Sequence, residues 1–82
     1  MSPQRGTLAV RVAVVGYGAW GPNHVRNFVT LLGVANVIVV ETDAERLVRA
    51  AEHYPGIGVA NDLSDVLGDP TVDAVCVATP TH

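Results

Sequence analysis

A run of apolar, mostly β-branched residues leads directly into three closely spaced glycines near the start of the chain. Residues 8–15 read LAVRVAVV, and Gly16, Gly18 and Gly21 follow with the spacing G-x-G-x-x-G. A continuous apolar run that ends at glycine is typical of a strand buried on both faces of a parallel sheet. Pro22 then predicts a helix start, because proline is tolerated in the first helical turn. The segment therefore predicts a strand–turn–helix unit, and we call residues 16–21 the glycine turn.

The rest of the chain alternates short apolar runs with segments of helical periodicity. Apolar runs at residues 37–40, 57–60 and 74–78 predict three further strands. The order β-α-β-α-β-α-β is typical of an α/β fold with a parallel sheet of the Rossmann type. Right-handed crossovers restrict the topology to a few choices, and among these we expect the strand order 3-2-1-4. The chain has 82 residues, whereas such domains usually have about 100–150. We therefore expect an incomplete domain over residues 8–82, after a loose leader at residues 1–7.

Local signals predict where the helices begin and end. Gly33 is a natural stop for the first helix, and Tyr54-Pro55-Gly56 ends the second. Thr42 and Glu45 have capping-box spacing, so we expect Thr42 to be the N-cap of the second helix. Either Asn61 or Asp62 is expected to cap a short third helix. The expected apolar stripes are Val25, Phe28, Val29 and Leu32 on the first helix, and Ala44, Leu47, Val48 and Ala51 on the second.

The glycine turn has the residue types that hold a pyrophosphate. Gly16 permits the tight turn, Gly18 lets phosphates approach the backbone, and Gly21 lets the helix pack close to the strand. The free N–H groups and the positive end of the helix dipole then face the phosphates. A glycine-rich turn without a ligand is the alternative interpretation. The predicted binding residues of the turn are Gly16, Tyr17, Gly18, Ala19, Trp20 and Gly21.

A carboxylate follows the second predicted strand at the spacing that a dinucleotide site requires. Glu41 lies 20 residues after Gly21 (41 − 21 = 20), where an acidic side chain accepts hydrogen bonds from the adenosine ribose. Such a carboxylate repels a 2′-phosphate, so the sequence favours NAD over NADP as the cofactor. An ordinary solvated charge is the alternative for Glu41. Asp43 is a second candidate, although helix capping is the favoured interpretation there.

Composition argues against several functional classes. The formal net charge is −3, and without a basic surplus we expect no nucleic-acid binding. Cys76 is the single cysteine, which excludes an internal disulfide and is compatible with a cytoplasmic protein. No apolar run reaches the roughly 18–20 residues of a membrane span, and no secretion signal is recognisable. No spacing predicts a catalytic nucleophile or metal ligands, so we assign neither catalytic nor metal-binding residues.

Two segments resemble the Gfo/Idh/MocA oxidoreductases, the family related to glucose–fructose oxidoreductase and inositol dehydrogenase. Residues 14–28 (VVGYGAWGPNHVRNF) resemble its beginning, and residues 73–82 (DAVCVATPTH) resemble a later strand with its Thr-Pro-x-His turn. The resemblance implies NAD(P)-dependent oxidation or reduction of a sugar, nucleotide-sugar or cyclitol. It implies that Glu41 stands where aspartate is more usual. It also implies that the cofactor is lined beyond the fourth strand by Thr79, Pro80 and His82.

The family's lysine-bearing Glu-Lys-Pro segment and its substrate domain have no counterpart here, and the chain contains no lysine. The resemblance therefore implies an N-terminal part of an oxidoreductase that is inactive alone and meets a sugar-like substrate only in the full-length enzyme. We expect weak NAD binding, and self-association through an exposed fourth strand. A stand-alone nucleotide-binding or regulatory module is the alternative. An S-adenosylmethionine methyltransferase is disfavoured by the third glycine and the Thr-Pro-x-His ending.

Overall fold

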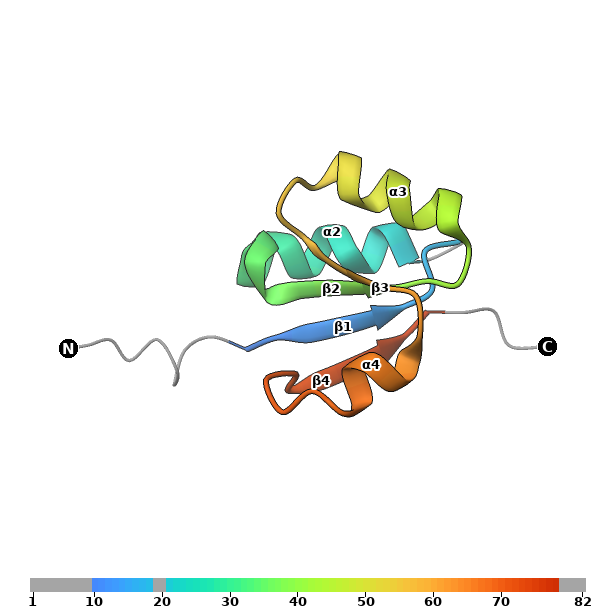
Figure 1. Cartoon of the computed structure of the whole chain (residues 1–82). Helices are drawn as coiled ribbons and strands as arrows, with labels where there is room; N and C mark the ends of the chain where they lie inside the picture. The colour runs from blue at the N-terminus through green and yellow to red at the C-terminus, as the bar shows by residue number, and fades with distance from the viewer. Residues whose placement is uncertain (1–9, 19–20, 79–82) are drawn as a thin grey trace.

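Four short apolar runs pair into one parallel sheet in the computed structural model, which describes residues 10–18 and 21–78 (Figure 1). The strands are β1 (Val12–Val15), β2 (Val37–Val40), β3 (Gly58–Ala60) and β4 (Ala74–Val77). The helices are α2 (Gly21–Leu32), α3 (Ala44–His53) and α4 (Leu63–Leu67), with a short 3-10 helix, η1 (Val34–Asn36), before β2. The strand order is β3-β2-β1-β4, which confirms the predicted order.

The central strand β1 positions the carboxyl ends of its neighbours at one edge of the sheet. Val12 pairs with Val37 on one side and with Ala74 on the other, and both pairings are parallel. Pairing continues just beyond the strands, because the Gly16 amide donates to the Val40 carbonyl at 2.8 Å. The Ala78 amide likewise donates to a β1 carbonyl at 2.8 Å. The glycine turn therefore starts between the ends of β2 and β4, where ligands of such sheets bind.

Helices cover the two faces of the sheet unequally (Figure 1). The larger hydrophobic core lies between the sheet and α2 with α3, and it contains Val14, Val25 and Ala50. The smaller core lies under α4, where Val66 packs against Ala13. Successive β1 side chains thus enter opposite cores, as expected for a strand buried on both faces. No helix in the described part of the chain is long and apolar enough to cross a membrane.

The first predicted strand was too long. β1 begins at Val12, because its partners β2 and β4 begin opposite that residue and offer no ladder before it. The leader at residues 1–7 and the first two residues of the predicted strand lie outside the described residues. The third and fourth predicted strands each lose one residue, giving Gly58–Ala60 and Ala74–Val77. Short parallel strands end where the neighbouring strand ends, which composition alone does not indicate.

The predicted capping box at α3 was wrong. Asp43, not Thr42, is the N-cap, and its Oδ1 accepts from the amides of Glu45 at 2.9 Å and Arg46 at 3.2 Å. The Asp43 amide donates to the Glu41 carboxylate at 2.9 Å. This bond holds the chain extended for one more residue, so the helix starts later than the capping-box spacing predicted. At α4 the cap is Asp62, one of the two predicted candidates.

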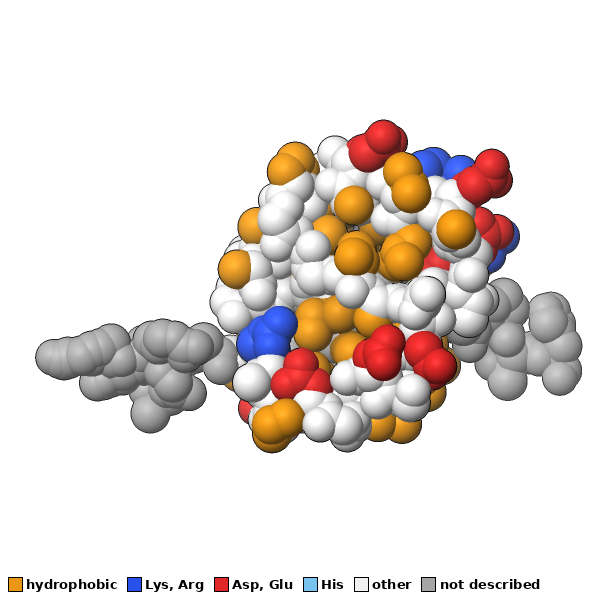
Figure 2. Space-filling view, viewed as in Figure 1, with side chains coloured by type: hydrophobic (Ala, Val, Ile, Leu, Met, Phe, Trp, Pro, Cys, Tyr) orange, Lys and Arg blue, Asp and Glu red, His pale blue; other side chains and the backbone are white. Residues whose placement is uncertain are grey.

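The predicted apolar stripe of α2 is confirmed, since Val25 is buried and its other members pack against the larger core. The stripe predicted for α3 was partly wrong. Ala50 is fully buried, whereas Val48 is 55% exposed. The reason is that β3 is a three-residue edge strand, which leaves the outer flank of α3 without a neighbour in the part of the chain that the structure describes. Figure 2 shows hydrophobic side chains exposed between α3 and α4, where Val48, Val59 and Leu63 are accessible.

Candidate nucleotide-binding site

The glycine turn leaves β1 through a backbone conformation and a close contact that both require glycine. Gly16 has φ = 101°, a left-handed conformation that side-chain-bearing residues rarely adopt. A Cβ on Gly21 would stand 2.0 Å from the Gly16 carbonyl oxygen. The first turn of α2 is therefore packed directly against the beginning of the glycine turn. This geometry is the close helix–strand approach that the sequence predicts for Gly16 and Gly21.

A pocket of about 620 Å³ opens at the carboxyl edge of the sheet, beside this turn. Four of the predicted site residues line it together, namely Gly16, Tyr17, Gly18 and Glu41. Gly18 is exposed, so its backbone is open to a ligand. The pocket volume lies within the usual range for small-molecule sites, about 300–1,000 Å³. The size of the pocket and the residues that line it therefore fit part of a dinucleotide.

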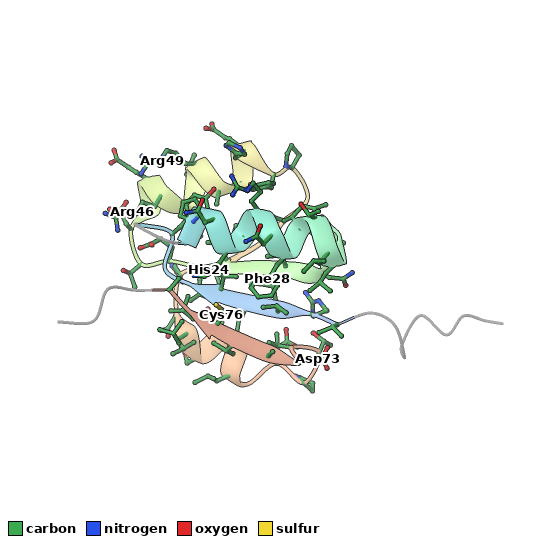
Figure 3. The ribbon with its side chains drawn as sticks, turned by 180° about the vertical axis from the view of Figure 1, so that it is seen from behind. His24, Phe28, Arg46, Arg49, Asp73 and Cys76 are labelled. Carbon is green, nitrogen blue, oxygen red and sulfur yellow. The ribbon has the colours of Figure 1, made fainter. Side chains whose placement is uncertain are left out.

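Six further lining residues were not predicted as site residues. They are Val15 and Val40 at the ends of β1 and β2, Thr42 after β2, Arg46 and Arg49 on α3, and Leu63 at the start of α4. Arg46 and Arg49 lie on the first turns of α3, at the same end of the molecule as the glycine turn (Figure 3). The Arg46 guanidinium lies 3.2 Å from the position that a Cβ on Gly18 would occupy. Their spacing of three residues, which places both on one helix face, is the signal that could have identified the pair.

Glu41 lies directly beside the glycine turn. Among the described residues it is the one charged side chain that is buried, with 7% exposure. Its Oε1 accepts from the Tyr17 amide at 2.7 Å, and its Oε2 accepts from the Asp43 amide at 2.9 Å. A carboxylate has about four accepting positions, so each oxygen keeps one for a ligand hydroxyl. A solvated strand-end charge does not describe this residue.

Tyr17 joins the turn to the larger core. Its side chain is 9% exposed and belongs to the cluster that also contains Ala50 of α3. Burial raises the pKa of the Tyr17 phenol above its ordinary value of 10.0, and nearby Tyr54 adds to the increase while Arg49 opposes it. The neutral phenol is therefore the form that the fold favours. The ring fixes the turn from one side, and the Glu41 carboxylate holds the same residue through its amide.

Gly21 lies in the described part of the chain but does not line the pocket, whereas the other predicted contacts lie outside the described residues. These are Ala19 and Trp20 in the glycine turn, and Thr79, Pro80 and His82 after β4. Within the described ranges, no three His, Cys, Asp or Glu side chains come together as a candidate metal site. Cys76 on β4 is partly buried and packs against the larger core, as expected for a small apolar side chain (Figure 3).

Comparison with known proteins agrees with the geometry. Residues 10–82 match the model of the Gfo/Idh/MocA oxidoreductase family, described as an NAD-binding Rossmann fold. The inositol 2-dehydrogenase of Acidothermus cellulolyticus is 38% identical over 77 residues, covering 90% of this chain and 23% of that protein. The inositol 2-dehydrogenase of Mycolicibacterium smegmatis is 42% identical over 79 residues, covering 89% and 22%.

A relative that is named for a different activity matches to a similar degree. The 4-carboxy-2-hydroxymuconate-6-semialdehyde dehydrogenase of a Sphingobium species is 35% identical over 73 residues, covering 89% of this chain. The chain spans between a fifth and a quarter of the length of these curated relatives, 22–23%. The similarity therefore concerns less than a quarter of the length of each of these relatives.

Proposed function

Because the chain belongs to the Gfo/Idh/MocA oxidoreductase family, as part of its NAD-binding Rossmann domain, we propose that it binds NAD for an enzyme that oxidises or reduces a sugar or cyclitol carbon. The observation that carries the proposal is the pocket in which Glu41 and the glycine turn lie together. When bound, the nicotinamide cofactor accepts or donates the hydride. The chain's own residues bind and orient its adenosine half.

The turn and Glu41 divide the binding of the cofactor between them. The backbone of Gly16 and Gly18 borders the pocket and admits the pyrophosphate without a Cβ in the way. The start of α2 supplies unpaired N–H groups and the positive end of its dipole. The free accepting positions of Glu41 receive the ribose hydroxyls. Leu63 offers an apolar surface to the adenine ring.

One carboxylate and two arginines with opposite effects bear on the choice between NAD and NADP. The Glu41 carboxylate favours free ribose hydroxyls, which supports NAD. Arg46 and Arg49 line the same pocket and would attract a 2′-phosphate, which supports NADP as the second candidate. We favour NAD because Glu41 is buried against the turn, whereas both arginines are exposed and exposed charges are screened by water and salt.

Titration calorimetry of the chain with NAD, NADP and S-adenosylmethionine tests this proposal. We expect NAD to bind with a dissociation constant of about 0.1–1 mM, because only the adenosine half of the cofactor is held. NADP should bind more weakly, and S-adenosylmethionine should give no heat. A preference for S-adenosylmethionine, or no binding of NAD at millimolar concentration, would refute dinucleotide binding.

The substrate and the activity belong to the same proposal. The relatives named as inositol 2-dehydrogenases support a cyclitol or sugar as the substrate. The relative named as a semialdehyde dehydrogenase indicates that a similar protein can be named for a different carbonyl compound. No catalytic residue is assigned among the described residues, so we expect no turnover of myo-inositol by the chain alone. Turnover with NAD in a spectrophotometric assay would contradict this part of the proposal.

We also infer that isolated copies of the chain associate through β4. This strand has no outer neighbour among the described residues, and Val77 is 67% exposed. An apolar edge strand readily pairs with another chain, and a lysine on such an edge opposes pairing. Sedimentation velocity should show a dimer that Val77→Lys dissociates and Leu31→Lys does not, since Leu31 is 77% exposed on α2. A monomer at high concentration would exclude this association.

A further inference from the structure

Glu41 contacts two loops at once, which ribose binding does not require. The Gly16 amide donates to the Val40 carbonyl at 2.8 Å. The next amide along the chain, that of Tyr17, donates to Glu41 Oε1 at 2.7 Å. The carboxylate thus adds one more hydrogen bond between the chain after β1 and the chain after β2. This bond lies beyond the described ends of both strands.

The second carboxylate oxygen connects this contact to α3. Oε2 accepts from the Asp43 amide at 2.9 Å. Asp43 in turn caps α3 by accepting from the amides of Glu45 and Arg46. Arg46 lies across Gly18 on the other side of the pocket. Glu41 is therefore the link between the glycine turn and the start of the helix that forms the opposite wall.

The chemistry of the link requires a carboxylate. Both partners are backbone donors, and a carboxylate is the side chain that offers two acceptors and no donor. A glutamine at this position would present one oxygen and one NH₂ group, so one of the two amides would lose its partner. Glu41 is 7% exposed, and water replaces a lost partner poorly at such a site.

We propose that Glu41 is a positioning residue for the glycine turn. Its carboxylate holds residues 16–18 of the turn at a fixed separation from α3, so this part of the turn is in place before any dinucleotide binds. Holding the turn and receiving ribose hydroxyls are compatible, because each oxygen has a second accepting position. The consequence for phosphate binding rests on the proposed function, whereas the link between the loops exists in the chain without ligand.

The unliganded wild-type chain provides the first test. NMR should detect a scalar coupling across the hydrogen bond between the Tyr17 amide nitrogen and the Glu41 carboxyl carbon. The Tyr17 amide should also exchange slowly with solvent, although it lies outside any strand. This measurement needs no variant, so it decides the proposal even if a variant fails to fold. An uncoupled Tyr17 amide that exchanges at the rate of an exposed loop would overturn the proposal.

Variants then separate positioning from general stability. In Glu41→Gln we expect the Tyr17 or Asp43 amide to exchange at least about tenfold faster relative to the Val39 amide, which reports on the central strands. Glu52→Gln removes the same charge at an exposed position near the end of α3. It should leave the exchange rates of the Tyr17 and Asp43 amides, each divided by that of the Val39 amide, unchanged. If these relative exchange rates were equal in Glu41→Gln and wild type, the positioning role would be refuted.

Inorganic pyrophosphate distinguishes this inference from the proposed function, because it has no ribose. If Glu41 acts only on ribose, Glu41→Gln should bind pyrophosphate as tightly as wild type, or more tightly because a negative charge is gone. A positioning role predicts affinity weaker by about threefold or more, since the turn is no longer held. Unchanged or tighter binding would therefore overturn it. Failure of wild type to bind pyrophosphate would instead count against dinucleotide binding, while the NMR measurements would still decide the link.

Discussion

Replacing Gly21 by alanine is the sharpest test of how the glycine turn packs against α2. The new Cβ would stand 2.0 Å from the Gly16 carbonyl oxygen, whereas C···O contacts in proteins lie at about 3.3–3.6 Å. Both atoms belong to the backbone or are fixed to it, so no side-chain rotation relieves the clash. The turn and the helix must separate by roughly 1.3 Å, the difference between these contact distances. Overpacking of this kind costs about 1–3 kcal/mol, and the backbone clash places Gly21→Ala at the upper end.

Alanine also favours the helical conformation by about 1 kcal/mol relative to glycine. The expected net loss in the free energy of unfolding is therefore about 2 kcal/mol, which lowers Tm by roughly 8–16 °C in a domain of this size. Differential scanning calorimetry should show this loss for Gly21→Ala. It should show no loss for the control Gly68→Ala, whose Cβ would have its nearest neighbour, the Ser64 carbonyl oxygen, at 3.6 Å. Equal melting temperatures for the two variants would refute the close approach of α2 to the turn.

Three further predictions concern charge. Arg46→Gln should weaken NADP binding by about tenfold, the loss of one charge-assisted contact, and NAD binding by less. Calorimetry should show no change for the exposed control Arg26→Gln. The folded-state pKa of Tyr17 is raised above 10.0, so its stabilising contribution is complete below pH 10 and is lost as the pH rises through the folded value. Urea denaturation should show that the free energy of unfolding falls less steeply between pH 9 and 12 in Tyr17→Phe than in wild type. Equal dependence on pH in the two proteins would contradict the raised pKa of Tyr17. Arg11 contacts Asp69 at 4.0 Å with both side chains partly exposed. Arg11→Ala should cost about 1 kcal/mol or less in urea denaturation, and a larger loss would show that the contact is not screened.

The features that were predictable from the sequence depend on local signals at fixed spacing. Alternating strands and right-handed crossovers leave only a few strand orders, of which 3-2-1-4 was the one expected, and the glycine turn follows from three glycines after a buried strand. Glu41 was predictable because strand β2 and helix α2 have lengths that bring its position back beside the turn. Each of these inferences concerns the backbone path, which short-range patterns largely determine.

The features that were not predictable depend on contacts between distant segments. Thr42 has the better capping-box spacing, yet Asp43 caps α3 because its amide is held by Glu41. Val48 has the helical spacing of a core residue, but no strand lies beyond β3 to cover it among the described residues. Leu63 reaches the pocket only because α4 starts beyond the end of β3. A single sequence does not state which partner such side chains meet.

The parallel pairings also imply an order of folding. The first residue pairs of the β1–β2 and β1–β4 ladders are separated by 25 positions (37 − 12) and 62 positions (74 − 12), respectively. Closing the longer loop costs more chain entropy, and contacts distant in sequence form late in folding. We therefore expect the β1–α2–β2 unit, with the glycine turn and Glu41, to form before β4 is added. Mutational φ-values should be higher at Val39 than at Val75, and the opposite ranking would exclude this order. The pocket beside the glycine turn would then be largely shaped while the last strand is still unpaired.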